Sequence, residues 1–277
     1  MYFPSSLITT AQLQKEYEKP NVILLDCTID KVGQSLKDAQ LALIPNSLFF
    51  DIENTFSDHS SPLPHTLVST EIFTKGIQEL GINQNSIIIL YDRWGVYSSP
   101  RAWWMFKVMD FEQVYVLDGG LPAWQEKHEP IADQYIKPLA KGNGEARFNR
   151  AWYADKDYIL TQYQNSGTRI IDARSQARFT ASAPEPRAGL RRGHIPYSSN
   201  LSFDLVLEGN NYRSKEELKK LFETFNATHE QIFSCGSGVT ASILAFASHL
   251  IGNQNIKVYD GSWSEWGQED LDLPIAQ

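Results

Sequence analysis

The sequence predicts an α/β fold, a central parallel sheet flanked by helices, and predicts that this arrangement occurs twice. Short continuous apolar runs, such as those at 21–25 and 87–90, are typical of strands that are buried on both faces. These runs alternate with helix-forming stretches, as expected when crossover helices connect parallel strands. The same landmarks then recur in the second half. A chain of 277 residues is long enough for two domains, each with its own core.

The first half opens with a short capped helix. Thr9 is a good N-cap, and Gln12, three residues later, completes the pattern of a capping box. Three strands are then expected, at 21–25, 87–90 and 113–117. Between the last two, the stretch 99–109 is rich in tryptophan and phenylalanine and predicts a mainly buried helix.

The second half repeats this order, with strands expected at 169–171, 231–234 and 256–259. The matched landmarks are Asp26 with Asp172, Ile44-Pro45 with Ile195-Pro196, Asp92 with Cys235, Gly95 with Gly238, Asp118-Gly119 with Asp260-Gly261, and Trp124 with Trp266. The spacing from Asp118 to Trp124 equals that from Asp260 to Trp266, so we infer an internal duplication. The stretch 131–150, with Lys137-Pro138 and Lys141-Gly-Asn-Gly144, interrupts the apolar period. We therefore expect domains at 1–138 and 151–277, joined by a linker at 139–150.

Composition excludes several function classes. The net charge is −8 and no block of like charges occurs, which argues against nucleic acid and against an anionic membrane surface as partners. No apolar run approaches the roughly 20 residues that a membrane-spanning helix needs. An anionic substrate must therefore be held by a few local arginines.

Cysteine usage indicates a reducing compartment. Only Cys27 and Cys235 occur, and such sparse usage suits a cytoplasmic protein in which a reactive thiol survives. The N-terminal residues have no basic segment followed by an apolar core, so we expect no signal peptide and a cytoplasmic location.

The stretch 232–250 carries the strongest candidate for chemistry. An apolar lead-in, a turn with Gly236 and Gly238 and a long apolar run predict strand, loop and helix, with Cys235 at the strand tip. The loop amides and the positive potential of the helix N-terminus would stabilise a thiolate there. The alternative is a small buried hydrophobic residue. A nucleotide P-loop would need Gly-Lys-Ser/Thr, and a Cys-x5-Arg phosphatase loop would need arginine at Ala241.

The duplication bears on this choice. The first half has Asp92 where the second has Cys235. A packing role for the cysteine would favour an apolar residue in the copy. The aspartate instead suggests a polar, accessible loop tip and favours a reactive cysteine.

The loop Cys235-Gly-Ser-Gly-Val-Thr resembles the active-site loop of the 3-mercaptopyruvate sulfurtransferases, the sister group of the rhodaneses. The resemblance extends over nearly the whole chain. It includes Phe49-Phe-Asp-Ile52, Tyr97-Ser-Ser-Pro-Arg-Ala-Trp-Trp104, Asp172-Ala-Arg, Arg178-Phe, Pro184-Glu-Pro-Arg187, Gly193-His-Ile-Pro196 and Tyr259-Asp-Gly-Ser-Trp-Ser-Glu-Trp266. It implies tandem rhodanese-like domains, of which only the second is catalytic.

The resemblance implies a reaction in two halves. A Cys235 thiolate takes the sulfur of 3-mercaptopyruvate as a persulfide, pyruvate leaves, and a small thiol, cyanide or thioredoxin accepts the sulfur. It also implies that no metal or organic cofactor takes part, and the sequence has no cluster of metal ligands.

The resemblance also assigns roles to particular residues. Ser237 is expected to act beside Cys235, and Arg178 and Arg187 are expected to bind the carboxylate and keto oxygen of the donor. The alternative for the arginines is that they are surface charges or partners of Glu185. The remaining expected substrate-contacting residues are His65, Gly236, Gly238, Val239 and Thr240, and a catalytic carboxylate is expected from either Glu53 or Asp58.

Two other functions stay open. The resembling thiosulfate enzymes carry cationic side chains in the loop, whereas Gly236 and Ser237 are neutral, which disfavours the thiosulfate dianion. A non-enzymatic persulfide carrier or docking module is the other alternative, but such a carrier does not need Arg178 and Arg187.

Two further motifs are interpreted as structural. We expect the ring of His194 to bond to backbone near its turn, and Trp263 and Trp266 to pack beneath the active-site strand. The family usually continues Ile-Pro-Gly, whereas this chain has Asn46 and Tyr197 after its two Ile-Pro pairs. If the glycine position has a positive φ, Asn46 tolerates it and Tyr197 does so poorly.

Overall fold

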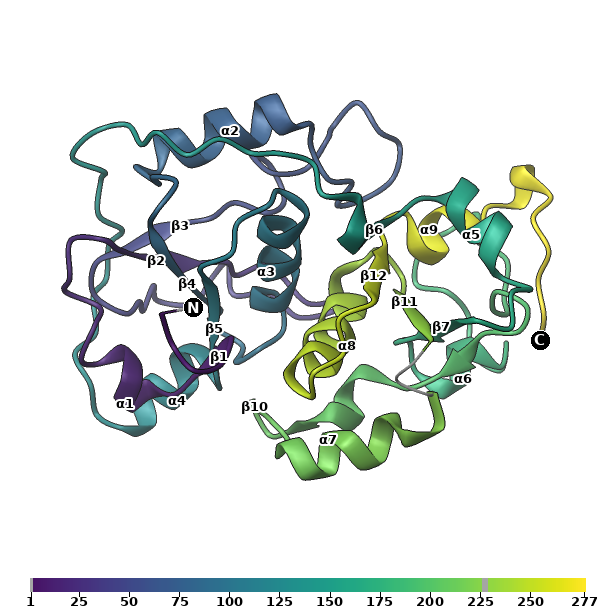
Figure 1. Cartoon of the computed structure of the whole chain (residues 1–277). Helices are drawn as coiled ribbons and strands as arrows, with labels where there is room; N and C mark the ends of the chain where they lie inside the picture. The colour runs from purple at the N-terminus through teal and green to yellow at the C-terminus, as the bar shows by residue number, and fades with distance from the viewer. Residues whose placement is uncertain (1, 226–228) are drawn as a thin grey trace. The chain divides into compact units, whose positions relative to one another are not determined.

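The computed structural model describes residues 2–225 and 229–277, which divide into two compact units (Figure 1). The first unit comprises Met1–Asp58, Leu67–Phe148 and Gly209–Tyr212. The second comprises His59–Thr66, Asn149–Glu208 and Arg213–Gln277. The placement of a linker at 139–150 stays a prediction.

The first unit is built on a five-stranded parallel sheet with the order β1-β5-β4-β2-β3. Its elements are β1 (Leu7–Ile8), α1 (Thr10–Leu13), β2 (Val22–Asp26), β3 (Ser47–Phe49), α2 (Thr70–Glu79), β4 (Ile87–Tyr91), α3 (Ser99–Val108), β5 (Val114–Leu117), α4 (Gly120–Glu126) and β10 (Asn211–Tyr212). The expected capping box at Thr9 and Gln12 is present at α1. The strands and the aromatic-rich helix predicted in this half are confirmed to within a residue or two.

Helices cover both faces of this sheet (Figure 1). Ile87, Ile89 and Tyr91 of β4 join a buried cluster with residues of α1 and α4, including Leu13 and Trp124. The alternate residues of β4 point to the opposite face, where α3 packs on β4 and β5. Burial of every β4 side chain explains why the strand is a continuous apolar run.

The second unit has a five-stranded parallel sheet with the order β6-β12-β11-β7-β8. Its strands are β6 (Tyr153–Ala154), β7 (Thr168–Asp172), β8 (Ser199–Asn200), β9 (Leu207–Glu208), β11 (Glu230–Ser234) and β12 (Ile256–Tyr259). Its α-helices are α5 (Lys156–Gln162), α6 (Gln176–Phe179), α7 (Lys215–Phe222), α8 (Val239–Leu250) and α9 (Ser262–Trp266). Short 3₁₀ turns lie at Arg150–Trp152, Phe203–Val206, Glu223–Phe225 and Glu269–Leu271.

Helices also cover both faces of the second sheet. Helix α8 packs on β11 and β12, and α7 packs on α8. The other face is covered by α5 and α9, whose Ile159, Trp263 and Trp266 lie in one buried cluster with Ile232 of β11. The predicted core role of the two tryptophans is confirmed, and the central strand β11 lies between two apolar layers.

The two sheets share one topology, which confirms the inferred duplication. In the first sheet β2 lies between β3 and β4, and in the second sheet β7 lies between β8 and β11. The short first strand of each sheet, β1 or β6, pairs with the last strand, β5 or β12. Asp26 and Asp172 both end the second strand. Trp124 and Trp266 are both fully buried, and each indole N–H donates to the carbonyl oxygen of a proline, Pro130 or Pro274, at 2.8 Å.

The two Ile-Pro turns also match. Asn46 and Tyr197 both have positive φ, at 67° and 63°. A positive φ was a conditional expectation at these positions, and both turns adopt it. Tyr197 therefore holds a left-handed conformation that asparagine tolerates better than a bulky side chain does.

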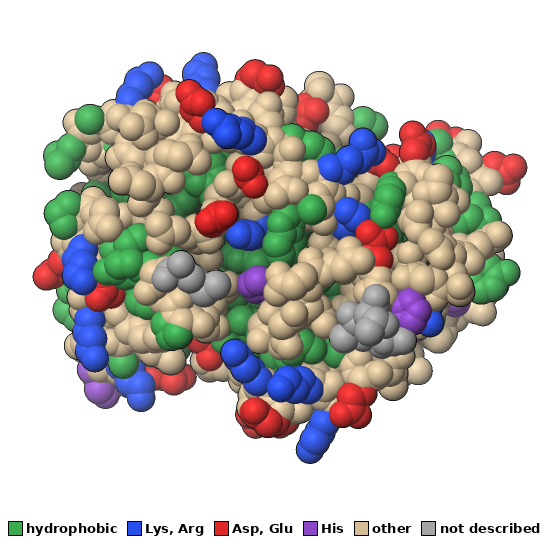
Figure 2. Space-filling model, viewed as in Figure 1, with side chains coloured by type: hydrophobic (Ala, Val, Ile, Leu, Met, Phe, Trp, Pro, Cys, Tyr) green, Lys and Arg blue, Asp and Glu red, His purple; other side chains and the backbone are tan. Residues whose placement is uncertain are grey.

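On the face seen in Figure 2, acidic and basic side chains are interspersed, and no large patch of a single charge sign is seen there. Within the described residues, no helix is both long enough and apolar enough to cross a membrane.

Candidate active site

Cys235 lies immediately after β11, at the carboxyl edge of the second sheet. Gly238, with φ of 79°, is the N-cap of α8, and the helix begins at Val239. The predicted loop is therefore shorter than expected, because Val239 and Thr240 already form the first turn of the helix. The first N–H groups of a helix have no intrahelical acceptor and carry positive potential, so this turn favours a negative charge beside it. Cys235 is 2% exposed.

The short helix α9 fixes the backbone of the loop. The Ser262 hydroxyl accepts the Cys235 N–H at 3.1 Å, and the Trp263 N–H donates to the Cys235 carbonyl oxygen at 3.0 Å. The Ser264 N–H and hydroxyl both donate to the Gly236 carbonyl oxygen, at 2.9 and 2.6 Å. No role was predicted for Ser262 or Ser264 from the sequence. The feature that could have identified them is their position directly after Asp260-Gly261, at the tip of β12, the strand next to β11.

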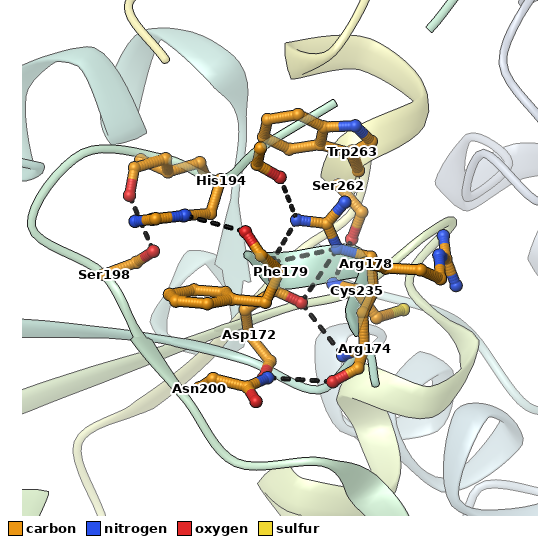
Figure 3. A network of polar contacts seen from close by, with 12 residues as sticks. Asp172, Arg174, Arg178, Phe179, His194, Ser198, Asn200, Cys235, Ser262 and Trp263 are labelled. Carbon is orange, nitrogen blue, oxygen red and sulfur yellow. Dashed lines mark hydrogen bonds and ion pairs between the residues drawn. The ribbon is translucent and has the colours of Figure 1, made fainter. Parts of the chain in front are cut away.

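A buried charge network lies beside this loop (Figure 3). The Arg174 guanidinium donates to both carboxylate oxygens of Asp172, to the Gly193 carbonyl oxygen at 2.8 Å, and to Glu185 Oε1 at 2.8 Å. It also stacks 4.2 Å from the ring centroid of Trp263, the residue whose N–H holds Cys235. The Arg174 side chain is fully buried. The motif Asp172-Ala-Arg was noted in the sequence, but the role of Arg174 was missed.

The two candidate donor-binding arginines lie over the loop residue that follows the cysteine. A Cβ placed on Gly236 would lie 3.3 Å from Arg178 Nη2 and 3.7 Å from Arg187 Nη1. Arg178 belongs to α6, and Arg187 lies in the segment that follows. Arg178 also pairs with Glu185 through Nε and Nη2. The glycine at 236 thus leaves room for both guanidinium groups.

His65 belongs to the second unit although it comes early in the chain. Its Nδ1 lies 3.1 Å from the Ser237 hydroxyl oxygen, and Ser237 is 7% exposed. Both residues were expected at the site from the sequence. The structure brings them into hydrogen-bond contact, and Ser237 lies two residues after Cys235. The pair can move a proton between imidazole and hydroxyl.

Glu53 and Asp58 both belong to the first unit. Glu53 lines a cavity of about 280 Å³ together with Asp30, Lys37 and Arg93. Partial desolvation, with Asp30 and Asp51 nearby, raises the pKa of the Glu53 carboxyl. The choice between Glu53 and Asp58 as a catalytic carboxylate stays a prediction.

Asp92, the counterpart of Cys235, corrects one expectation. It is fully buried rather than accessible. Its carboxylate accepts the N–H groups of Trp94, Ser98 and Ser99 at 2.9–3.0 Å and the Ser99 hydroxyl at 2.8 Å. Aspartate is found there because the N-terminus of α3 binds a negative charge, not because the loop tip meets solvent. The matching place in the first sheet is thus filled by a side chain that accepts backbone N–H groups at a helix N-terminus, and Cys235 precedes the corresponding helix, α8.

His194 has the structural contacts expected of it. Its Nδ1 lies 2.9 Å from the Phe179 carbonyl oxygen, and its ring stacks on Phe179 with centroids 3.8 Å apart (Figure 3). These contacts anchor the end of α6, the helix that carries Arg178. Among the described residues, no group of three histidine, cysteine, aspartate or glutamate side chains is placed to hold a metal ion.

The chain is similar to known proteins over nearly its whole length. The rhodanese-like domain model matches residues 9–127 and 155–269. The chain is 40% identical to the 3-mercaptopyruvate sulfurtransferase of Escherichia coli K12 over 271 residues, which cover 95% of each protein. It is 34% identical to the mitochondrial thiosulfate/3-mercaptopyruvate sulfurtransferase 1 of Arabidopsis thaliana, over 97% of this chain and 77% of that protein.

Among solved structures, the chain is similar to the crystal structure of SseA from Escherichia coli, described as a 3-mercaptopyruvate sulfotransferase with the rhodanese fold. The TM-score is 0.84 at 34% identity, and the match covers 94% of this chain and all of that one. Two rhodanese-like domains on one chain are the arrangement that the duplicated sheets predict.

Proposed function

Since this chain belongs to the rhodanese-like sulfurtransferase family, we propose that it moves a sulfur atom from 3-mercaptopyruvate through a Cys235 persulfide to a thiol, cyanide or thioredoxin. One observation carries the proposal. Cys235 begins the short loop that leads into α8, and the guanidinium groups of Arg178 and Arg187 lie over Gly236, the next residue. A nucleophile for sulfur and two donors for a carboxylate and a keto oxygen thus occupy one site.

In the first half-reaction, the Cys235 thiolate attacks the donor sulfur. A new S–S bond forms and the C–S bond breaks, and its electron pair goes to carbon as the enolate of pyruvate, which then takes up a proton. Arg178 and Arg187 would hold the donor carboxylate and the keto oxygen, where negative charge develops. In the second half-reaction, the acceptor attacks the outer sulfur, the S–S bond breaks, and the thiolate returns.

The remaining roles are proposed for the loop amides and for the hydrogen-bonded pair Ser237 and His65. The N–H groups of Gly236, Gly238, Val239 and Thr240 lie along the loop and the first turn of α8, where they would face the thiolate and the persulfide. Ser237, bonded to His65, would exchange the proton that the leaving enolate and the incoming thiol require.

The carboxylate near the donor would come from Glu53 or Asp58, as the family resemblance predicts. The same resemblance supports thioredoxin as an acceptor. Two free cysteines, both buried, suit a reducing compartment such as the cytoplasm.

A second candidate function is thiosulfate sulfurtransfer on the same site. The Arabidopsis relative, whose name includes both donors, favours it. The absence of a cationic side chain at Gly236 and Ser237 disfavours it. A persulfide carrier without enzymatic activity is less consistent with two arginines placed over the loop.

The test is kcat/KM for 3-mercaptopyruvate and for thiosulfate, measured side by side with cyanide as the common acceptor. We expect a clear preference for 3-mercaptopyruvate. Cys235→Ser should abolish turnover with both donors and leave the free energy of unfolding nearly unchanged, because one small buried side chain replaces another. A preference for thiosulfate would favour the second candidate function, thiosulfate sulfurtransfer. Sulfur transfer at the normal rate by Cys235→Ser would contradict the mechanism.

A further inference from the structure

Glu185 joins the donor-binding arginine to the buried network under the loop. Its Oε1 accepts Arg174 Nη1 at 2.8 Å and Arg178 Nε at 3.2 Å, and its Oε2 accepts Arg178 Nη2. The Glu185 side chain is 2% exposed, whereas that of Arg178 is 23% exposed. Arg178 therefore donates to Glu185 through Nε and through one N–H of Nη2, and the N–H groups of Nη1 and the second N–H of Nη2 remain for a ligand.

The formal charges in this network cancel. Asp172 and Glu185 are two carboxylates, and Arg174 and Arg178 are two guanidinium groups, all linked by contacts within 3.2 Å. Arg187 has no such compensation within the second unit, since no carboxylate among the described residues of that unit pairs with it. The net side-chain charge that the second unit places over Gly236 is thus that of one guanidinium, although two lie there.

We propose that Glu185 is a specificity-determining residue that sets the donor charge this site accepts, by neutralising Arg178 and leaving Arg187 as the uncompensated cation. The proposal rests on the function proposed above. A monoanionic donor such as 3-mercaptopyruvate matches one uncompensated guanidinium. A dianionic donor such as thiosulfate brings a second charge that Glu185 repels.

The first experiment removes the charge and keeps the shape. In Glu185→Gln, the amide oxygen still accepts a hydrogen bond, and Arg174 keeps Asp172 and the Gly193 carbonyl oxygen. The ratio of kcat/KM for thiosulfate to that for 3-mercaptopyruvate should rise about tenfold, since one extra positive charge near the donor favours the dianion. Glu185→Asp keeps the charge and should keep the wild-type ratio. Glu216→Gln, on the exposed face of α7, removes the same charge elsewhere and should leave the ratio unchanged.

The second experiment reads the charge of the site without sulfur transfer. Cys235 Sγ displaces iodide from both iodoacetate and iodoacetamide, which have similar size but differ by one negative charge. Both reagents consume the same thiolate, so the ratio of their rates at the Cys235 peptide cancels any change in thiolate reactivity. The iodoacetate to iodoacetamide ratio should rise about tenfold in Glu185→Gln and fall in Arg178→Gln. The double variant restores the wild-type charge and should return the ratio to near its wild-type value.

The outcomes are distinguishable. An unchanged alkylation ratio in Glu185→Gln, or an equal rise in Glu216→Gln, would overturn the proposal. So would a raised alkylation ratio with an unchanged donor ratio, because Glu185 would then not govern donor choice. If the wild-type protein turned over neither donor, the proposed function would fail, and the alkylation ratios alone would decide whether Glu185 sets the charge. If Glu185→Gln did not fold, the double variant Glu185→Gln, Arg178→Gln would still test the proposal: its ratio should stay near the wild-type value, and a ratio as low as that of Arg178→Gln alone would overturn the proposal.

Discussion

Asp92 and Cys235 take the same place in the two sheets, directly after the central strand and before a helix N-terminus. The Asp92 carboxylate accepts three backbone N–H groups and one hydroxyl, and none of it reaches solvent. In the first unit, the Asp92 carboxylate is thus enclosed by the loop that follows β4. The second has a thiol there, which the proposed function would use as a nucleophile.

Replacing the enclosed carboxylate should therefore be costly. Asp92→Ala would leave buried donors on Ser98 and Ser99 without an acceptor and should lower the free energy of unfolding by about 2–4 kcal/mol. Asp92→Asn keeps one acceptor oxygen and should cost less. The measurement is urea unfolding, with the exposed Asp133→Ala as control, expected within about 0.5 kcal/mol of wild type. A loss no larger than that of the control would show that the carboxylate does not organise the loop.

At the scale of elements, the two Ile-Pro turns offer a reciprocal comparison. Asn46 and Tyr197 hold the same left-handed conformation, and both are exposed. Tyr197 is 76% exposed, and its ring centroid lies 6.3 Å from that of Tyr163, so its side chain contributes little packing. The backbone conformation therefore dominates the effect of a substitution there.

Exchanging the two residues tests this reading. Tyr197→Asn should raise the free energy of unfolding by about 0.5–1 kcal/mol, because asparagine adopts positive φ at lower cost. Asn46→Tyr should lower it by a similar amount. Thermal or urea unfolding measures both changes. If the two substitutions shifted stability in the same direction, local backbone strain would not be the cause.

At the scale of the whole molecule, duplication has given two sheets of one topology but only one candidate nucleophile. The other cysteine, Cys27, follows β2 in the first unit and is fully buried. Burial, with Asp26 and Asp92 nearby, raises the pKa of the Cys27 thiol well above its usual value. Cys27 is thus a neutral, inaccessible thiol, and the chain should carry one sulfur at a time.

Mass spectrometry after exposure to the donor without an acceptor tests this stoichiometry. The chain should gain the mass of one sulfur atom, on the peptide that contains Cys235. Cys27→Ala should load as the wild type does, and Cys235→Ser should not load. A second sulfur on Cys27 would contradict the assignment of an inert thiol.

The sequence by itself determined the α/β class, the duplication and the candidate nucleophile. These are local or periodic signals: apolar strands such as β4 are buried on both faces, and landmarks such as Trp124 and Trp266 recur at equal spacing. Local signals also placed Cys235 between a strand and a helix. Arg178, Arg187, Ser237 and His65 came from resemblance to a family, and their chemical roles remain predictions.

Only the tertiary structure decided how the Cys235 loop is held and which side chain pairs with Arg178. Ser262 and Ser264 hold the Cys235 loop, and Glu185 compensates Arg178, because the fold brings together segments that are distant in sequence. The burial of Asp92 was missed for the same reason, since an aspartate at a strand tip has no sequence mark of a buried anion. Residue type and spacing report which element a side chain lies on. The partner that compensates its charge depends on packing between elements, and that is set by the fold.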